Sequence, residues 1–122
     1  MKDLTGRNPL EKHVQRNIIE WLGCRNISAV HVPNGSVLAG DGKQRAIQSA
    51  ALKRAGMRPG FPDLILFSPK GGIGFIEVKR ADGSLSNTQE ACRDWLQGLG
   101  HQGGLARSVD DAEAVVTGWG WI

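Results

Sequence analysis

The sequence predicts an α/β domain in which helices flank a mixed β-sheet. Three observations predict this class. Apolar residues recur every four positions over residues 10–22, two short apolar runs flank a turn sequence over residues 64–76, and helix-start signals stand at Ser86 and Ser108. The 122 residues are expected to form one domain, residues 1–122, with elements in the order α-β-α-β-β-α-β-α.

The first helix is expected to start with Asn8 as its N-cap, Pro9 at the first helical position and Glu11 at the third. Gly23 is expected to end this helix. A four-residue spacing predicts that one side of the helix is buried. That buried stripe consists of Leu10, Val14, Ile18 and Leu22.

A short strand is expected from Ile27 to Val32, where the turn sequence Pro33-Asn34-Gly35 stops it. Residues 36–43, SVLAGDGK, are expected to form a flexible loop. A second helix is expected from Gln44 to Arg54.

The apolar runs LILF and IGFI are expected to pair as an antiparallel β-hairpin whose turn centres on Lys70. Opposed positions in such a pair have a constant sum, so Leu64 faces Ile76 and Asp63 faces Glu77. The Cβ atoms of directly opposed residues lie roughly 4.5–5.5 Å apart. The hairpin therefore predicts two carboxylates side by side.

A third helix is expected from Ser86 to Leu99, with Ser86 and Gln89 in a capping box. A short strand at Gly104–Arg107 and a last helix from Ser108 through Val116 complete the elements. The terminal sequence GWGWI is expected to pack against the domain or a partner, which makes it a candidate dimer interface. Five apolar residues in this helix and just before it are available for the core: Leu85, Ala91, Trp95, Leu96 and Leu99.

The composition permits a polyanionic partner, because the net charge is +3 and the pI is about 9.2. No run of 18 apolar residues is present, so no membrane span is expected. The first residues carry no apolar stretch typical of a secretory signal. Two cysteines without a CxxC motif, and scattered histidines, argue against a zinc site and favour reduced thiols in a cytoplasm.

Asp63, Glu77 and Lys79 are expected at one end of one face of the hairpin, because strand side chains alternate between faces. Opposed like charges destabilise a sheet unless a cation lies between them. Two oxygen ligands with open positions suit Mg²⁺ or Mn²⁺, which can polarise a phosphodiester and activate a bound water. A nearby lysine can orient that water or stabilise the charge that develops on the phosphate. The alternative is a surface ion pair between Glu77 and Lys79, with Asp63 as a turn residue.

The motifs GFPD at residues 60–63, IEVK at 76–79 and SNTQ at 86–89 resemble the PD-(D/E)XK nuclease superfamily, and within it the VRR-NUC family. The resemblance covers most of the chain and includes the PNG turn at residues 33–35 and the sequence AGMRPGFPD. It implies a restriction-endonuclease-like mixed sheet flanked by helices. It also implies a metal-dependent endonuclease that uses Mg²⁺ or Mn²⁺.

The resemblance implies a role for each residue of the site. Asp63 and Glu77 are the implied metal ligands, the backbone carbonyl of Val78 is a candidate third ligand, and Lys79 is the implied catalytic lysine. The acid of the first helix and a residue at the next helix start complete the implied set. These are Glu11, which is also a candidate metal ligand, and Gln89.

The resemblance also implies the partner. VRR-NUC members are similar in fold to Holliday-junction resolvases and act on structured DNA, and members this short are typically stand-alone, dimeric, and phage or bacterial. A structure-selective endonuclease of branched or duplex DNA, in the cytoplasm of a bacterial or phage-infected cell, is therefore expected. A non-catalytic DNA-binding module that keeps the fold is the alternative from another class, and an RNA-processing nuclease is a third.

Several residues keep a structural alternative. Glu11 can cap its helix and favour the helix dipole, and Gln89 can serve only in the capping box. Asn34 fits a plain turn as well as the site. The remaining DNA-binding candidates form a basic cluster that could grip phosphates or simply be a solvated face. These candidates are Lys43, Arg45, Lys53, Arg54, Arg58 and Arg80.

Overall fold

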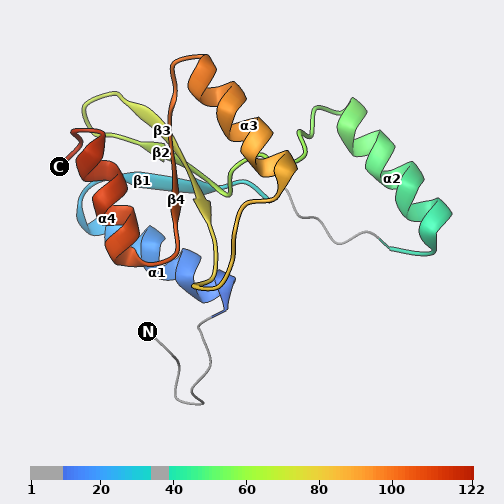
Figure 1. Cartoon of the computed structure of the whole chain (residues 1–122), viewed down its shortest axis with the longest axis horizontal. Coiled ribbons are helices and arrows are strands. Elements are labelled where there is room, and N and C mark those ends of the chain that lie inside the picture. The colour runs from blue at the N-terminus through green and yellow to red at the C-terminus, as the bar shows by residue number, and fades with distance from the viewer. Residues whose placement is uncertain (1–9, 34–38) are drawn as a thin grey trace.

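The computed structural model describes residues 10–33 and 39–122 (Figure 1). Within these residues the order of elements is the one that the sequence predicts. The helices are α1 (Glu11–Cys24), α2 (Gly42–Arg54), α3 (Asn87–Gly98) and α4 (Val109–Gly118). The strands are β1 (Ser28–His31), β2 (Leu64–Phe67), β3 (Ile73–Val78) and β4 (Gln102–Ala106).

The strands form one mixed sheet in the order β1-β2-β3-β4. The β1–β2 and β2–β3 pairs are antiparallel, whereas β3 and β4 are parallel. A parallel pair needs a crossover connection, and α3 supplies it between β3 and β4. This arrangement confirms the predicted α/β class with a mixed sheet.

The hairpin of β2 and β3 has the predicted register. Leu64 pairs with Ile76, and Phe67 pairs with Ile73. In the turn, the backbone N–H of Ser68 donates to the carbonyl of Gly72 at 2.8 Å. One further step of the same register brings Asp63 opposite Glu77, at the end of the hairpin away from its turn.

Helices cover both faces of the sheet, with α1 and α4 on one face and α3 on the other (Figure 1). Even-numbered residues of β2 and β3, such as Leu64 and Ile76, belong to the larger core under α1 and α4. On the other face, Phe75 of β3 packs with Cys92 and Leu96 of α3 in a smaller core. Because side chains alternate along a strand, the odd-numbered positions of β3 point toward α3.

The start of α1 differs from the expectation. The helix begins at Glu11, and Leu10 is its N-cap, without a side-chain capping bond. The predicted third helical position of Glu11 was therefore wrong, and Asn8 and Pro9 lie outside the described residues. Leu10 is exposed, so it does not belong to the buried stripe. The other members of that stripe are buried as predicted: Val14, Ile18 and Leu22.

The second helix begins earlier than expected. Asp41 caps α2 by accepting a hydrogen bond from the N–H of Gln44 at 2.9 Å. The side-chain oxygen of Gln44 in turn accepts a hydrogen bond from the N–H of Asp41, which completes a capping box. The prediction of a loop as far as residue 43 was therefore wrong at its end, because an aspartate three residues before a glutamine is itself a helix start. Residues 34–38 of that predicted loop lie outside the described residues.

The third helix has the predicted capping box, with Ser86 as the N-cap, but it buries fewer of its own side chains than expected. Of the five residues offered to the core, only Leu96 is buried. Trp95 keeps 40% of its surface exposed and Leu99 keeps 60%. The reason is geometric: the strands below α3 present a narrow apolar strip, which Cys92 and Leu96 already cover.

The C-terminal tryptophans fold back onto the domain. The rings of Trp119 and Trp121 meet edge to face with 5.0 Å between their centroids. Trp119 lies against Gly74 of β3 so closely that a Cβ there would collide with the indole, and Trp121 lies beside Gly72 in the same way. The tryptophans are thus partly buried against their own sheet, and a role of GWGWI in a dimer interface stays a prediction.

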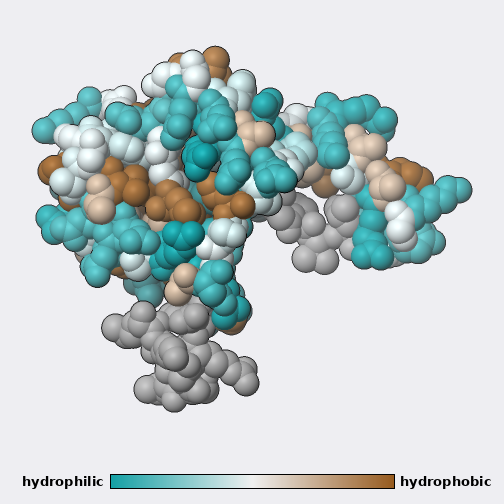
Figure 2. All heavy atoms as spheres, viewed as in Figure 1, coloured by the Kyte–Doolittle hydropathy of each residue, from teal (hydrophilic) through white to brown (hydrophobic). Residues whose placement is uncertain are grey.

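The helix α2 stands away from the body of the domain (Figure 1). None of its residues is buried, and Ile47 keeps 59% of its surface exposed. Hydrophilic and hydrophobic residues are both visible on this arm (Figure 2). Across the described residues, no helix is both long enough and apolar enough to cross a membrane.

Candidate functional site

Two hydrogen bonds from backbone N–H groups fix the position of Asp63. It lies just before β2, where its carbonyl accepts a hydrogen bond from the N–H of Val32 at 2.8 Å. Its side-chain Oδ2 accepts a second one from the N–H of Val78 at 2.8 Å. The carboxylate is therefore fixed against the end of β3, beside the residues that follow Glu77.

Glu77 is the buried charged residue of the described part of the chain, with 7% of its surface exposed. Its odd position in β3 turns the side chain toward α3 rather than into the larger core. Burial raises the pKa of Glu77 to about 9, and both a hydrogen bond to Asp63 and the charge of Asp63 act in the same direction. Burial beside a second carboxylate therefore favours the neutral form of Glu77 when no cation is bound.

Lys79 follows at the end of β3, where its backbone N–H donates to the carbonyl of Ala106 at 3.0 Å. It stands two positions after Glu77, so both side chains leave the same face of the strand. Its charge lowers the pKa of Glu77 and also that of Glu11. The sheet therefore places a cation beside the two carboxylates, as the sequence predicts.

Glu11, in the first turn of α1, lies near Asp63 and Lys79. Burial raises the pKa of its carboxyl, and the charge of Asp63 adds to this rise, while Lys79 and Arg80 lower it. Glu20, the other acid of the helix, is exposed. The structure thus brings Glu11 close to the carboxylate pair, and its first-turn position also favours the helix dipole.

The side chain of Gln89 caps its own helix and also lines a pocket beside Glu77. Its side-chain oxygen accepts a hydrogen bond from the N–H of Ser86 at 2.9 Å, which completes the capping box. It also lines a small pocket together with Glu77. The capping role is therefore present, and the same side chain borders the carboxylates.

Arg93 is a neighbour that the sequence analysis missed. It lines the same small pocket as Glu77 and Gln89, and its Nη2 lies 3.4 Å from Oδ1 of Asp94. The signal in the sequence is its spacing, because a residue four positions after Gln89 in a helix lies on the same side. Arg93 therefore forms part of the pocket wall beside Glu77 and Gln89.

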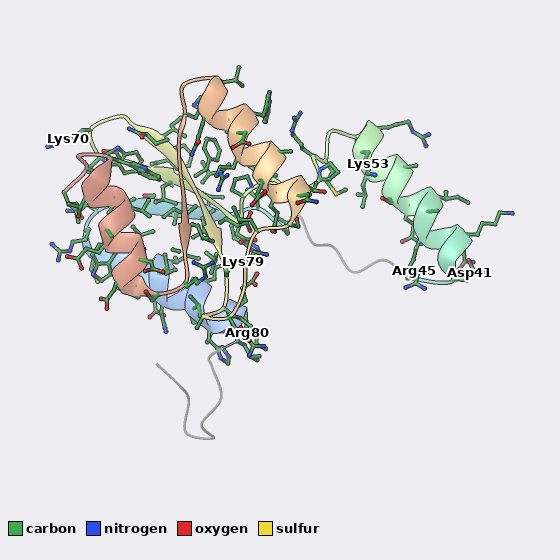
Figure 3. All side chains as sticks on the ribbon, viewed as in Figure 1. Asp41, Arg45, Lys53, Lys70, Lys79 and Arg80 are labelled. Carbon is green, nitrogen blue, oxygen red and sulfur yellow. The ribbon has the colours of Figure 1, made fainter. Side chains whose placement is uncertain are left out.

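The predicted DNA-binding residues are spread over two parts of the molecule (Figure 3). Lys53 lies at the end of α2 nearer the body and Arg45 at the far end, while Arg80 follows Lys79 beside α1. Arg80 also forms an ion pair with Asp82, with 3.5 Å between Nε and Oδ1. Asn34 lies outside the described residues. The other candidates on or next to the arm are exposed: Lys43, Arg54 and Arg58.

The described residues contain no group of three or more histidines, cysteines, aspartates or glutamates arranged to hold a metal. They do offer the pair of Asp63 and Glu77, with Glu11 close by. A divalent cation bound between these two acids would neutralise the charge that opposes the ionisation of Glu77. Hard oxygen donors suit Mg²⁺ or Mn²⁺, which keep water ligands and accept phosphate oxygens, better than they suit zinc.

A mixed sheet that carries acids and a lysine at one strand end defines, as a class, a nuclease-like α/β domain. The VRR-NUC domain matches residues 11–110, so the chain belongs to the VRR-NUC family, a family of nuclease domains. No curated protein matches the chain.

Two solved structures share the fold. One, described as a VRR_NUC domain protein, has a TM-score of 0.65 and 21% identity, and the match covers 91% of this chain and 88% of the other. A second, described as a VRR_NUC domain, has a TM-score of 0.60 and 18% identity, with 88% of this chain and 94% of the other covered. The family match confirms the predicted family, and these structural similarities confirm the predicted fold.

Proposed function

We propose that the protein is a Mg²⁺- or Mn²⁺-dependent endodeoxyribonuclease that hydrolyses phosphodiester bonds in branched or duplex DNA. One observation carries the proposal: the hairpin register and the hydrogen bond from Val78 to Asp63 place Asp63 beside the buried Glu77 at the end of the sheet, next to Lys79. A purely structural pair of carboxylates would gain nothing from burial without a cation, because the buried pair opposes its own ionisation. Membership of a nuclease family supports the same activity.

In this proposal Asp63 and Glu77 hold the metal, with the carbonyl of Val78 as a third ligand and Glu11 as a further candidate. The bound metal would polarise the phosphate and lower the pKa of an attacking water. Lys79 orients that water or donates a hydrogen bond to the charge that develops on the phosphate. Gln89 completes the site from the start of α3, beside Glu77.

The partner in this proposal is DNA, and branched or junction-containing DNA in particular. Basic residues of the α2 arm and the body, among them Lys53, Arg54 and Arg80, would contact phosphates, which supply most sequence-independent affinity. The free thiols of Cys24 and Cys92 fit the cytoplasm of a bacterial or phage-infected cell.

A homodimer belongs to the same proposal. One active site cuts one strand, so paired cuts in a symmetric junction call for two sites related by a two-fold axis. Sedimentation equilibrium of the purified protein tests this directly. A mass of one chain across the working concentration range would contradict the dimer.

Cleavage assays test the nuclease. Linear duplex, flap and four-way-junction DNA are incubated with the protein and Mg²⁺, Mn²⁺ or EDTA. Asp63→Asn keeps an oxygen that can accept the hydrogen bond from Val78, so it removes charge without removing the local structure. Glu20→Gln, an exposed acid of α1, is the matched control. We expect metal-dependent cutting that Asp63→Asn loses and Glu20→Gln keeps.

Two outcomes would contradict the proposal in different ways. Binding of all three DNAs without cutting by either metal would favour the alternative, a DNA-binding module that keeps the nuclease fold. Cutting of the corresponding RNA in preference to DNA would indicate an RNA-processing nuclease, since the 2′-OH distinguishes the two substrates.

A further inference from the structure

A groove runs beside the carboxylate pair, between α3 and the segment that joins α2 to β2. It encloses about 900 Å³, within the range of roughly 300–1,000 Å³ that is typical of ligand sites. Most of its wall is apolar and comes from residues such as Met57, Phe61, Ala91 and Trp95. The end of β1 closes one side, at Val32.

The groove already contains a stacked pair. The guanidinium carbon of Arg58 lies 3.7 Å from the ring centroid of Trp95, while 40% of the Trp95 surface remains exposed. An indole held this way, in the wall of a groove, is a flat platform that a further π-system can extend. The spacing of Trp95 in α3 predicts a core position, so only the structure reveals this platform.

The charges that line the groove have one sign. Lys53 and Arg58 are its charged lining residues, and no acid lies among the described residues that form its wall. Lys53 lies at the end of α2 that faces the body (Figure 3). An apolar wall with cations at its rim is complementary to a molecule that has both a flat apolar part and negative charge.

The groove and the carboxylate pair share a wall. Phe61 of the groove lies two residues before Asp63, and Thr88 of the groove lies directly before Gln89. Gly60 holds these two segments together: with φ of +75°, it lies so close to α3 that a Cβ would meet the carbonyl oxygen of Thr88 at 2.6 Å. The groove is therefore built from segments that continue directly into Asp63 and Gln89 of the candidate site.

We propose that this groove binds an unpaired nucleotide of the DNA substrate, with its base stacked on the Trp95–Arg58 pair and its phosphate near Lys53. The proposal rests on the proposed function and specifies its substrate: DNA with unpaired bases next to the bond that is cut. A duplex presents phosphates and hides the faces of its bases, so an apolar wall would contribute nothing to binding it. An unpaired base exposes both faces and stacks on aromatic side chains whatever its sequence.

Binding without cleavage tests the proposal. Fluorescence anisotropy in EDTA compares three labelled DNAs: a blunt duplex, the same duplex with a short single-stranded overhang, and that overhang with abasic sites in place of its bases. The variants are Trp95→Ala, Trp95→Phe and, as the matched control, Leu99→Ala. Leu99 is an exposed apolar residue one turn further along from Trp95 and does not line the groove.

We expect the wild type to bind the overhang about tenfold more tightly than the abasic overhang, a ratio in the range of one stacked base. Trp95→Ala abolishes this preference, whereas Trp95→Phe and Leu99→Ala keep most of it. Equal affinity of the wild type for the two overhangs would overturn the proposal. A second result would also overturn the proposal. If Trp95→Ala no longer self-associates in sedimentation but keeps the base preference, the groove is a contact between two copies of the chain and not a nucleotide site.

The readout separates this proposal from the nuclease activity. The preference for bases is measured in EDTA, where no metal-dependent cutting takes place. A protein that shows the preference but never cuts DNA would contradict the nuclease and support the groove. A protein that cuts DNA without the preference would do the reverse.

Discussion

The carboxylate of Asp63 accepts a hydrogen bond from the backbone N–H of Val78 at 2.8 Å, one residue beyond Glu77. This bond continues the β2–β3 pairing past its last ladder pair, Leu64 and Ile76, with a side chain in place of a backbone carbonyl. The position of the acid is thereby tied to the strand that carries Glu77 and Lys79. Such a site is fixed by the sheet itself rather than by flexible side chains alone.

Replacement of the lysine tests its part in cleavage. Lys79→Ala removes the cation beside Asp63 and Glu77, while the backbone bond of residue 79 to Ala106 remains. We expect DNA binding close to that of the wild type and a cleavage rate lower by about 10²–10³-fold, the usual effect of losing one charge-stabilising group. Single-turnover cleavage and anisotropy measure the two quantities separately.

Lys70→Ala is the matched control for that experiment, because Lys70 lies in the turn at the other end of the same hairpin (Figure 3). It should cut at the wild-type rate. A cleavage rate of Lys79→Ala equal to that of Lys70→Ala would remove the lysine from the mechanism.

The stability of the metal-free protein should depend on pH. The pKa of Glu77 is raised to about 9 in the folded state, above its ordinary value of 4.5. A raised folded-state pKa stabilises the fold at acidic pH. This contribution is lost as the pH rises from the ordinary pKa of 4.5 to the folded-state pKa of about 9. Urea unfolding in EDTA between pH 5 and pH 9 should show the free energy of unfolding falling across this range.

Glu77→Gln mimics the protonated acid and should flatten much of this pH dependence. Addition of Mn²⁺ at pH 8 should stabilise the wild type, since a ligand that binds only the folded state raises its stability, and should stabilise Glu77→Gln much less. A wild-type stability that is constant from pH 5 to pH 9 would be inconsistent with a raised pKa of the buried Glu77.

The two roles of Gln89 can be separated with its capping partner. Ser86→Ala and Gln89→Ala each break the capping box of α3 and should each lower stability by about 1 kcal/mol. Only Gln89→Ala also removes a side chain from the pocket beside Glu77. We therefore expect cleavage to slow in Gln89→Ala but not in Ser86→Ala, with both assayed well below their melting temperatures. Equal rates would leave Gln89 as a capping residue only.

Gly60 should tolerate no side chain. Its φ of +75° disfavours alanine, and the added Cβ would press against the backbone of Thr88. Gly60→Ala should lower the free energy of unfolding by about 1–3 kcal/mol. Gly98→Ala in α3 is the control, because nothing lies within 4 Å of its added Cβ, and it should leave stability unchanged or slightly higher. Urea denaturation compares the two, and an unaffected Gly60→Ala would show that this segment can shift away from α3.

The hairpin was predictable to the residue, because its register follows from one turn and from the alternation of apolar positions. The predicted pairs of Leu64 with Ile76 and of Asp63 with Glu77 depend on that local geometry alone. The capping box of α3 was equally local. Where the sequence expresses a structure through neighbours a few residues apart, it predicts that structure well.

Trp95 shows where this local information ends. Its spacing is compatible with the core of α3, but Cys92 and Leu96 fill the available strip, and Arg58 from a distant segment stacks on the exposed indole. Arg93 was missed for a related reason: its spacing from Gln89 places both on one side of α3, but that this side borders Glu77 is decided by the packing of α3 on the sheet. Which side of α3 meets the sheet is decided by packing between elements far apart in the chain.

The α2 arm has no buried residue, so the body of the domain does not depend on its sequence for a core. Its 13 residues span about 20 Å at 1.5 Å per residue, a length comparable with about six base steps of DNA. If the α2 arm contacts DNA as proposed, its length would set how far from the carboxylates it can bind a phosphate. Lengthening or exchanging it would change the footprint on DNA while the sheet and its acids stay in place.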